Sequence, residues 1–191
     1  QLARMPNLKA VFYAAGATDA FARPLLNHGI RLVSAWRANA IPVAEFTVAQ
    51  IILSMKNYFT NSAAVRGPES WNQKTAGPGC YGETVALIGA GAISGKVQEM
   101  LKNFNLKVIV VPSRPERRTI SLEEVFRTAY VVSNHLPNRE DNQKILTKEM
   151  FASMRPNATF INTGRGAQVD EKGLIEVLKQ RPDLTALLDV T

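Results

Sequence analysis

The feature that most constrains the fold is the segment of residues 84–95, TVALIGAGAISG, in which an apolar run passes into a glycine-rich turn. A strand that ends in such a turn and leads into a helix can hold a dinucleotide pyrophosphate over the helix N-terminus. Gly89 supplies the tight turn, and Gly91 lets the backbone approach the phosphates. Ala92 and Ile93 begin the helix, and their amide groups point at the negative charge. The segment therefore predicts a dinucleotide-binding strand, turn and helix.

The motif departs from the full pattern G-x-G-x-x-G at its third glycine. Ser94 stands at that position and Gly95 follows one residue late, so we expect slightly relaxed packing of the helix on the strand. The mononucleotide P-loop, G-x-x-x-x-G-K-[ST], is the competing interpretation. It fails because Ala90 stands five residues before Gly95, and because Val97 rather than a hydroxyl residue follows Lys96. A dinucleotide site is favoured.

Strand and helix signals alternate along almost the whole chain. Besides the strand of the glycine motif, apolar runs predict strands at residues 9–14, 30–33, 107–111, 130–133, 158–162 and 184–190. Helices are predicted from Pro42, from the capping pattern Ser121-x-x-Glu124, and near residues 147–154 and 170–180. Strands separated by helices form crossover units. The predicted fold is α/β, with a doubly wound parallel sheet of Rossmann type covered by helices on both faces.

The helix predicted from Pro42 is long and has one buried face. Apolar or small residues recur with helical spacing at Ala44, Val48, Ile51, Met55 and Tyr58. Glycine- and proline-rich stretches at residues 67–70 and 76–82, which flank Trp71, predict an extended connection to the glycine motif. We interpret the buried face as ordinary core packing.

Composition narrows the class of protein. The 191 residues, 46% hydrophobic and 20% charged, are typical of a soluble globular chain of one large domain or one and a fraction. No apolar run approaches the roughly 18 residues that cross a membrane, and the N-terminus lacks the core of a signal peptide. We therefore expect a cytoplasmic protein with no membrane partner. Its single cysteine, Cys80, excludes an internal disulfide and suggests an inert loop thiol.

The net charge of +7 could indicate nucleic-acid binding, but the basic residues are spread along the chain. Only residues 114–118, RPERR, are locally dense. They form either a solvated loop or a positive field that attracts an anionic cofactor, and we expect no nucleic-acid partner. No metal site is expected, because His28 and His135 lie far apart and no cysteine or histidine cluster has ligand spacing.

Two strand ends carry candidate binding residues. The strand of residues 107–111 would normally lead into an acid that binds the ribose of NAD, about 20 residues after the glycines. Here Pro112, Ser113 and Arg114 follow, and Ser113 with Arg114 could bind the 2′-phosphate of NADP. We favour NADP over NAD, the alternative being that Arg114 is only a turn residue. Arg165, between two glycines, suits a substrate carboxylate, the alternative being a surface arginine.

Several segments together resemble the D-isomer-specific 2-hydroxyacid dehydrogenases, a family that includes phosphoglycerate dehydrogenases and glyoxylate or hydroxypyruvate reductases. The resemblance lies in the glycine loop, HLPN, INTGRGAQVDEKGLIEVL, ALLDV and NAIPVAEFTVAQIILSM, which are residues 89–95, 135–138, 161–178, 186–190 and 39–55. It covers nearly the whole chain. It implies hydride transfer between C4 of a nicotinamide, NAD(P), and C2 of a 2-keto or 2-hydroxy acid.

The resemblance also implies roles for single residues. Arg165 would be the catalytic residue that clamps the substrate carboxylate and polarises its carbonyl. The cofactor would be lined by His135, Pro137, Thr163 and Asp189, with Asp189 near the nicotinamide carboxamide. His135 matches the cofactor loop, so we reject it as the proton donor.

The domain organisation follows from the same resemblance. Residues 1–41 would be a remnant of a split, flavodoxin-like substrate domain, and residues 42–191 the NAD(P)-binding domain, truncated at its C-terminal end. The acid–base histidine and its glutamate are expected beyond Thr191, so the chain would be an internal piece of a longer enzyme and inactive by itself. A homodimer is expected by analogy. The alternative function is a dinucleotide-sensing module of the corepressor type without turnover; which 2-hydroxy acid is the substrate stays open.

Overall fold

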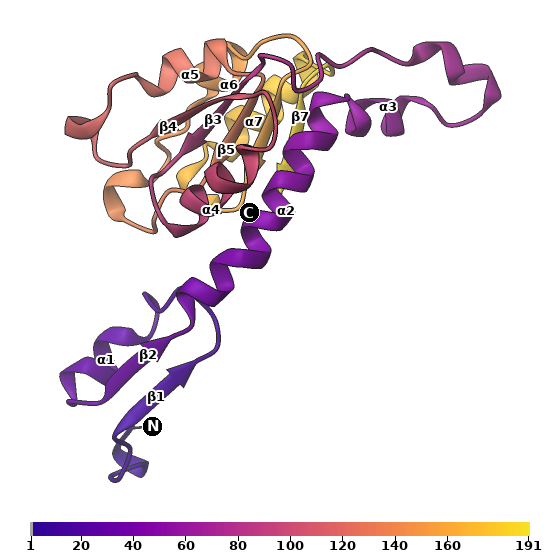
Figure 1. The fold of residues 1–191 in the computed structure, drawn as a ribbon. Coiled ribbons are helices and arrows are strands. Elements are labelled where there is room, and N and C mark those ends of the chain that lie inside the picture. The colour runs from indigo at the N-terminus through magenta and orange to yellow at the C-terminus, as the bar shows by residue number, and fades with distance from the viewer. Residues whose placement is uncertain (1) are drawn as a thin grey trace. The chain divides into compact units, whose positions relative to one another are not determined.

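The computed structural model describes residues 2–191, which form two compact units (Figure 1). The first unit ends at Val43 and the second spans Ala44–Thr191. From the sequence we placed the boundary between residues 41 and 42.

The first unit is a small parallel α/β segment. A single turn of 3₁₀ helix, η1 (Leu2–Arg4), precedes strand β1 (Ala10–Tyr13), helix α1 (Ala22–Asn27) and strand β2 (Arg31–Ser34). The two strands pair in parallel, so α1 serves as the crossover between them.

The second unit contains a five-stranded sheet in which every pairing is parallel, in the order β4-β3-β5-β6-β7. Its strands are β3 (Thr84–Ile88), β4 (Lys107–Val111), β5 (Val131–Asn134), β6 (Thr159–Asn162) and β7 (Thr185–Leu188). The helices are α2 (Trp36–Met55), which begins in the first unit, α3 (Tyr58–Ala64), α4 (Ala92–Leu101), α5 (Leu122–Thr128), α6 (Lys148–Ala152) and α7 (Glu171–Gln180). Short 3₁₀ turns are η2 (Pro68–Gln73), η3 (Pro115–Arg117), η4 (Glu140–Asn142) and η5 (Gly166–Gln168). The parallel α/β fold predicted from the sequence is confirmed.

Alternation along the strands produces two cores, one on each face of the sheet. Ala86 and Ile88 of β3 point into a core with α5, α6 and α7. Val85 and Leu87 point the other way, into a core with α2 and α4. Because side chains alternate across a strand and both faces are covered, β3 reads as a continuous apolar run. The sheet is therefore doubly wound, as expected.

Two helices begin at residues whose side chains cap them, and the cap at Ser121 was predicted from the sequence. The hydroxyl of Ser121 accepts a hydrogen bond from the amide of Glu124 at 3.1 Å and starts α5. The carboxylate of Asp170 accepts one from the amide of Gly173 at 3.2 Å and starts α7. Each cap satisfies an amide that the helix itself cannot pair.

The long helix differs from its prediction at both ends. It begins at Trp36, six residues before Pro42, which lies inside it, and it ends at Met55. Proline fits a helix start best because it lacks an N–H, but here the fold tolerates the lost bond in the second turn. Asn57 then adopts a left-handed backbone with φ 51°, so Tyr58 opens α3 and is 52% exposed instead of extending the buried face.

The earlier start also corrects our expectation about membrane-spanning length. Over Trp36–Met55 the helix is long and apolar enough to cross a membrane by length and composition, and about a third of it is buried. The sequence did not suggest this because charged and polar residues interrupt the apolar run, while the mean hydropathy of the helix is still 1.3. Core helices pass the same test, and Ala44, Ile51 and Met55 of α2 are fully buried in the second unit.

Candidate functional site

The carboxyl ends of all five parallel strands meet at one edge of the second unit's sheet. Ile88 at the end of β3 is in register with Val111 of β4 on one side and with Asn134 of β5 on the other. The chain thus leaves β3 towards one side of the sheet and returns on the other, which makes β3 the switch point where doubly wound sheets bind ligands. Every site residue predicted from the sequence follows one of these strand ends: Gly89, Gly91, Ala92, Ile93, Ser113, Arg114, His135, Pro137, Thr163, Arg165 and Asp189.

Gly89 sits where only glycine fits. Its φ is 106°, a conformation that residues with a side chain rarely adopt, and its amide donates to the carbonyl of Val111 at 2.7 Å. A Cβ at this position would lie 2.5 Å from the carbonyl oxygen of His135. Gly89 therefore lets the loop after β3 pass directly against the loop after β5.

Gly91 is the N-cap of α4 and has open space beside it. Its φ of −92° is ordinary, and a Cβ there would have no atom of the described chain within 4 Å. A glycine has no side chain that could cap the amides of Ala92 and Ile93, so these donors are left for a ligand. An exposed helix N-terminus with free amides and room for close backbone approach fits a pyrophosphate.

Ser94 replaces the third glycine as a buried residue. Its side chain is 1% exposed, and its hydroxyl has no hydrogen-bond partner among residues 2–191. Gly95, by contrast, lies on the exposed side of α4. Ser94, not the late glycine, therefore occupies the position that faces the core.

The end of β4 is held by an arginine that the sequence analysis did not single out. Arg118 donates from Nε to the carbonyl of Pro112 at 3.0 Å and from Nη2 to that of Ser113 at 2.9 Å. Arg114 stays 59% exposed and has Glu116 at 3.8 Å. The basic run is thus not uniform, because one guanidinium shapes the loop and another faces solvent. The only sequence signal for the role of Arg118 was the local density of basic residues.

His135 is buried between two hydroxyl groups. Its Nε2 lies 3.0 Å from the hydroxyl of Ser133, and its Nδ1 lies 3.0 Å from that of Thr163. Burial lowers the pKa of the imidazole from 6.5 to about 4, because desolvation disfavours the charged form. The ring is therefore neutral near pH 7 and ties the loop after β5 to the loop after β6, and a neutral ring with both nitrogens engaged does not suit a proton donor.

Arg165 lies in the turn between β6 and η5 and is partly buried. Its Nη1 donates to the carbonyl of Gly164 at 2.7 Å, which draws the side chain back over its own turn. Asp189, at the end of β7, is exposed, and its amide donates to the carbonyl of Asn162 at 3.0 Å. A charged guanidinium at the same sheet edge as the glycine turn can orient an anion beside a bound dinucleotide.

Three buried carboxamides beneath this edge were missed as functional candidates. Asn134, Asn162 and Gln168 are at most 2% exposed, and hydrogen bonds join Asn134 to both of the others. Polar residues at the ends of strands were visible in the sequence, but nothing local indicated that their side chains meet.

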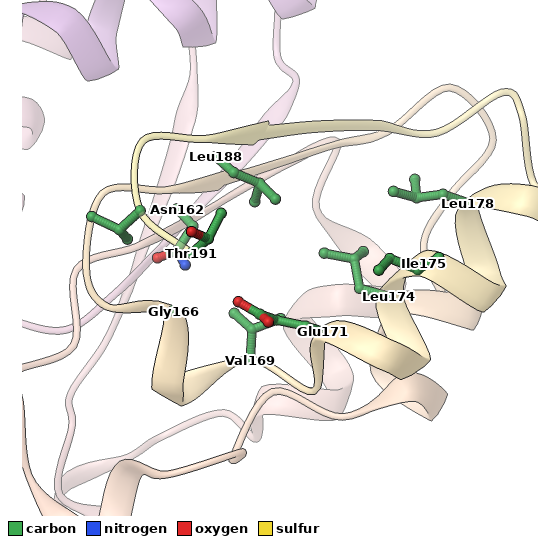
Figure 2. Close-up of a pocket in the computed structure, with 10 residues that line it drawn as sticks. Asn162, Gly166, Val169, Glu171, Leu174, Ile175, Leu178, Leu188 and Thr191 are labelled. Atoms are coloured by element: carbon green, nitrogen blue, oxygen red, sulfur yellow. The ribbon is translucent and has the colours of Figure 1, made fainter.

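A separate, mainly apolar cavity of about 170 Å³ lies beside β7. Figure 2 shows the side chains of Leu174, Ile175 and Leu178 from α7 facing the same space as Leu188. Asn162, Gly166, Glu171 and Thr191 also line it. The predicted cofactor residues do not line it, so it is distinct from the glycine turn.

The comparisons agree with this geometry. The family model described as D-isomer specific 2-hydroxyacid dehydrogenase, NAD binding domain, matches residues 48–191. A D-3-phosphoglycerate dehydrogenase from Methanocaldococcus jannaschii is 30% identical over 171 residues, covering 85% of this chain and 33% of that protein. A glyoxylate reductase from Aeropyrum pernix is 31% identical, covering 77% of this chain and 48% of that one. Among solved structures, an acyclic imino acid reductase (Bsp5) in complex with NADPH and D-Arg is 25% identical with a TM-score of 0.75, covering 95% of this chain and 61% of that one.

The chain thus spans about a third to a half of the length of the two curated relatives. The match to the family model covers the glycine turn, the five-stranded sheet and all the predicted site residues. This chain belongs to the D-isomer specific 2-hydroxyacid dehydrogenase family and carries its NAD-binding domain.

Proposed function

We propose that this chain is the cofactor-binding part of an oxidoreductase that transfers a hydride between a nicotinamide and a 2-hydroxy or 2-keto acid. The observation that carries the proposal is the turn after β3, where Gly89 makes the close approach and Gly91 leaves open space before the free amides of α4. The relatives, named as a phosphoglycerate dehydrogenase and a glyoxylate reductase, support the substrate class. When bound, the cofactor would donate or accept the hydride at its nicotinamide.

Within this proposal, each residue of the candidate site has a positioning or electrostatic role. The amides of Ala92 and Ile93 bind the pyrophosphate, and Gly91 lets it come close. Arg165 clamps the substrate carboxylate and stabilises charge that develops on the carbonyl oxygen. His135, Pro137, Thr163 and Asp189 line the cofactor. His135 does so as a neutral ring, since its pKa is lowered to about 4.

We also propose that the chain prefers NADP to NAD. The position of the usual ribose-binding acid is Pro112, so no carboxylate there repels a 2′-phosphate. Arg118 donates to the carbonyls of Pro112 and Ser113 and so fixes the backbone of the loop, while Arg114 stays exposed. Ser113 and Arg114 would then bind the phosphate directly. That the imino acid reductase was solved with NADPH supports the choice.

The test is a titration of the purified chain with NADPH and with NADH, followed by nicotinamide fluorescence. We expect tighter binding of NADPH and loss of that preference in Arg114→Ala, by about tenfold for one charged hydrogen bond. Arg127→Ala is the matched control, because Arg127 is another exposed arginine and is likewise paired with a glutamate, on α5. Equal binding of both cofactors would refute the preference, and binding of neither would refute the cofactor role.

We further propose that residues 1–41 belong to the substrate domain and that the chain alone does not turn over. Among residues 2–191, His135 is the only histidine at the sheet edge, and it is buried and neutral. General acid–base catalysis normally supplies about 10² to 10⁴ in rate, so its absence would leave binding without measurable reaction. Oxidation of NADPH by this chain with glyoxylate, at a rate well above the uncatalysed one, would contradict this proposal.

A homodimer is proposed from the outer face of α2. Phe46, Ala49 and Leu53 are exposed with a spacing that puts them on one side of the helix, opposite the buried Ala44 and Ile51. An apolar stripe of this kind suits a second copy of the chain. We expect sedimentation of a dimer that Phe46→Glu dissociates. The control is Gln98→Glu, which makes the same charge change on the exposed side of α4; a monomeric wild-type chain would refute the proposal.

A further inference from the structure

The side chain of Gln168 lies under the site, is 2% exposed and makes four hydrogen bonds. Its Oε1 accepts from Asn134 Nδ2 at 2.8 Å and from the amide of Arg165 at 3.2 Å. Its Nε2 donates to the carbonyls of Leu136 at 3.0 Å and of Pro137 at 2.8 Å. A carboxamide has two donor hydrogens and two acceptor lone pairs, so Gln168 uses its whole capacity.

These four bonds join two loops that leave neighbouring strands. Leu136 and Pro137 belong to the loop after β5, which the proposed function assigns to the cofactor. Arg165 belongs to the turn after β6, which it assigns to the substrate carboxylate. The His135–Thr163 contact also joins these two loops, but Gln168 bonds directly both to the cofactor loop and to the backbone of the substrate arginine.

The backbone of Arg165 is held on both of its polar groups. Its amide donates to Gln168 Oε1, and its carbonyl accepts from the amide of Gln168 at 3.3 Å and from Asn162 Nδ2 at 3.3 Å. The side chain is fixed in turn by its bond to the carbonyl of Gly164. A shift of the Gln168 carboxamide would thus move the base of the Arg165 side chain.

Gly164 leaves the room that this arrangement needs. A Cβ at this position would lie 2.8 Å from Asn134 Nδ2 and 2.8 Å from Gln168 Oε1. No left-handed φ is recorded there, so the demand for glycine comes from the carboxamides and not from the backbone.

We propose that Gln168 is a positioning residue that couples occupation of the cofactor loop to binding of a substrate carboxylate at Arg165. The inference rests on the proposed function of Arg165. A bound dinucleotide would restrict the motion of Leu136 and Pro137. Through its hydrogen bonds to both loops, Gln168 would then also restrict the motion of the Arg165 backbone. The consequence is that a carboxylate binds more tightly once the cofactor is in place, with a coupling of about tenfold.

The test uses oxalate, a stable dicarboxylate that resembles a 2-keto acid, titrated calorimetrically into the chain with and without saturating NADPH. The first variant is Gln168→Met, which keeps the side chain's length and removes its hydrogen bonds. The second is Asn134→Leu with Gln168→Met, which also removes the Asn134 donor that the first variant leaves without its Gln168 acceptor, because an orphaned buried donor costs stability. Thermal unfolding confirms that the variants fold.

We expect the wild-type chain to bind oxalate about tenfold more tightly with NADPH than without it. In both Gln168 variants this ratio should fall to about one, while the affinity for NADPH alone stays within about twofold. A role confined to stability would not change the ratio, so a double variant that folds and keeps the wild-type ratio overturns the proposal.

Arg165→Ala separates this inference from the function on which it rests. We expect it to abolish oxalate binding and to leave NADPH binding intact. If the wild-type chain binds no oxalate, or if Arg165→Ala binds it normally, the role of Arg165 is wrong and the inference falls with it. If Arg165 is required but the ratio does not depend on Gln168, only the inference is overturned.

Discussion

Replacing Gly91 by alanine should weaken cofactor binding about tenfold to a hundredfold without harming the fold. Gly91 has φ −92° and ψ −168°, which alanine adopts freely, and its Cβ would meet no atom within 4 Å. A compatible glycine-to-alanine change raises the free energy of unfolding by about 0.4–1 kcal/mol. The same methyl group would fill the space into which a pyrophosphate must come. Losing one hydrogen bond to a charged group costs about 1.5–3 kcal/mol, or about tenfold to a hundredfold in Kd.

Two other glycines of the segment serve as controls with opposite expectations. Gly89→Ala puts a Cβ at φ 106° and 2.5 Å from the carbonyl oxygen of His135, so it should lower the free energy of unfolding by about 3 kcal/mol or more. Gly95→Ala lies inside α4 with no atom within 4 Å of its Cβ. It should stabilise the fold by about 0.5–1 kcal/mol and leave cofactor affinity unchanged.

The assay combines urea unfolding of each variant with a fluorescence titration by NADPH. Only Gly91→Ala should keep the stability of the fold while lowering the affinity for NADPH. Wild-type affinity in Gly91→Ala would refute the placement of the pyrophosphate over this turn. A lower free energy of unfolding in Gly91→Ala would instead contradict the finding that a Cβ at residue 91 meets open space.

The remaining predictions concern stability. The pKa of His135 is about 4 in the folded chain and ordinarily 6.5, so the unfolded chain binds the proton first as the pH falls. Lowering the pH from 6.5 to 4 should therefore lower the free energy of unfolding by about 3 kcal/mol. Urea unfolding across this range should show the loss, and His135→Gln should remove the part of it that is due to this histidine. Ser121→Ala removes the cap of α5 and should cost about 1 kcal/mol in the same assay, whereas an unchanged midpoint would mean that the cap contributes nothing. Gly164→Ala drives a methyl group against two buried carboxamides and should cost about 1–3 kcal/mol, whereas thermal unfolding at the wild-type temperature would contradict the contacts described.

Much of the fold could be predicted because its signals are local. The strand at Lys107–Val111 was predicted with its observed bounds, and the cap at Ser121 was identified from a four-residue pattern. The start of α2 could not be predicted in this way. Pro42 marks a helix start by local preference, but the helix begins at Trp36 and the fold absorbs the missing hydrogen bond.

The candidate site divides in the same manner. The glycine turn, Arg165 and the strand ends that carry them were predicted from residue type and spacing. Arg118 and Gln168 were not, because their partners are backbone carbonyls whose positions no local pattern reveals. Gln168 reaches Leu136 across 32 positions of sequence.

The alternation of strands and helices, the glycine turn after β3 and the basic residues after β4 could all be predicted from local sequence, because periodicity, caps and the φ of glycine depend on near neighbours. Three further features became visible in the folded chain: β3 lies between β4 and β5, Ser94 faces the core, and burial keeps His135 neutral. Strand order, burial and desolvation arise from contacts between segments far apart in the chain. Those contacts bring the carboxyl ends of the five strands together at the edge that carries the candidate site.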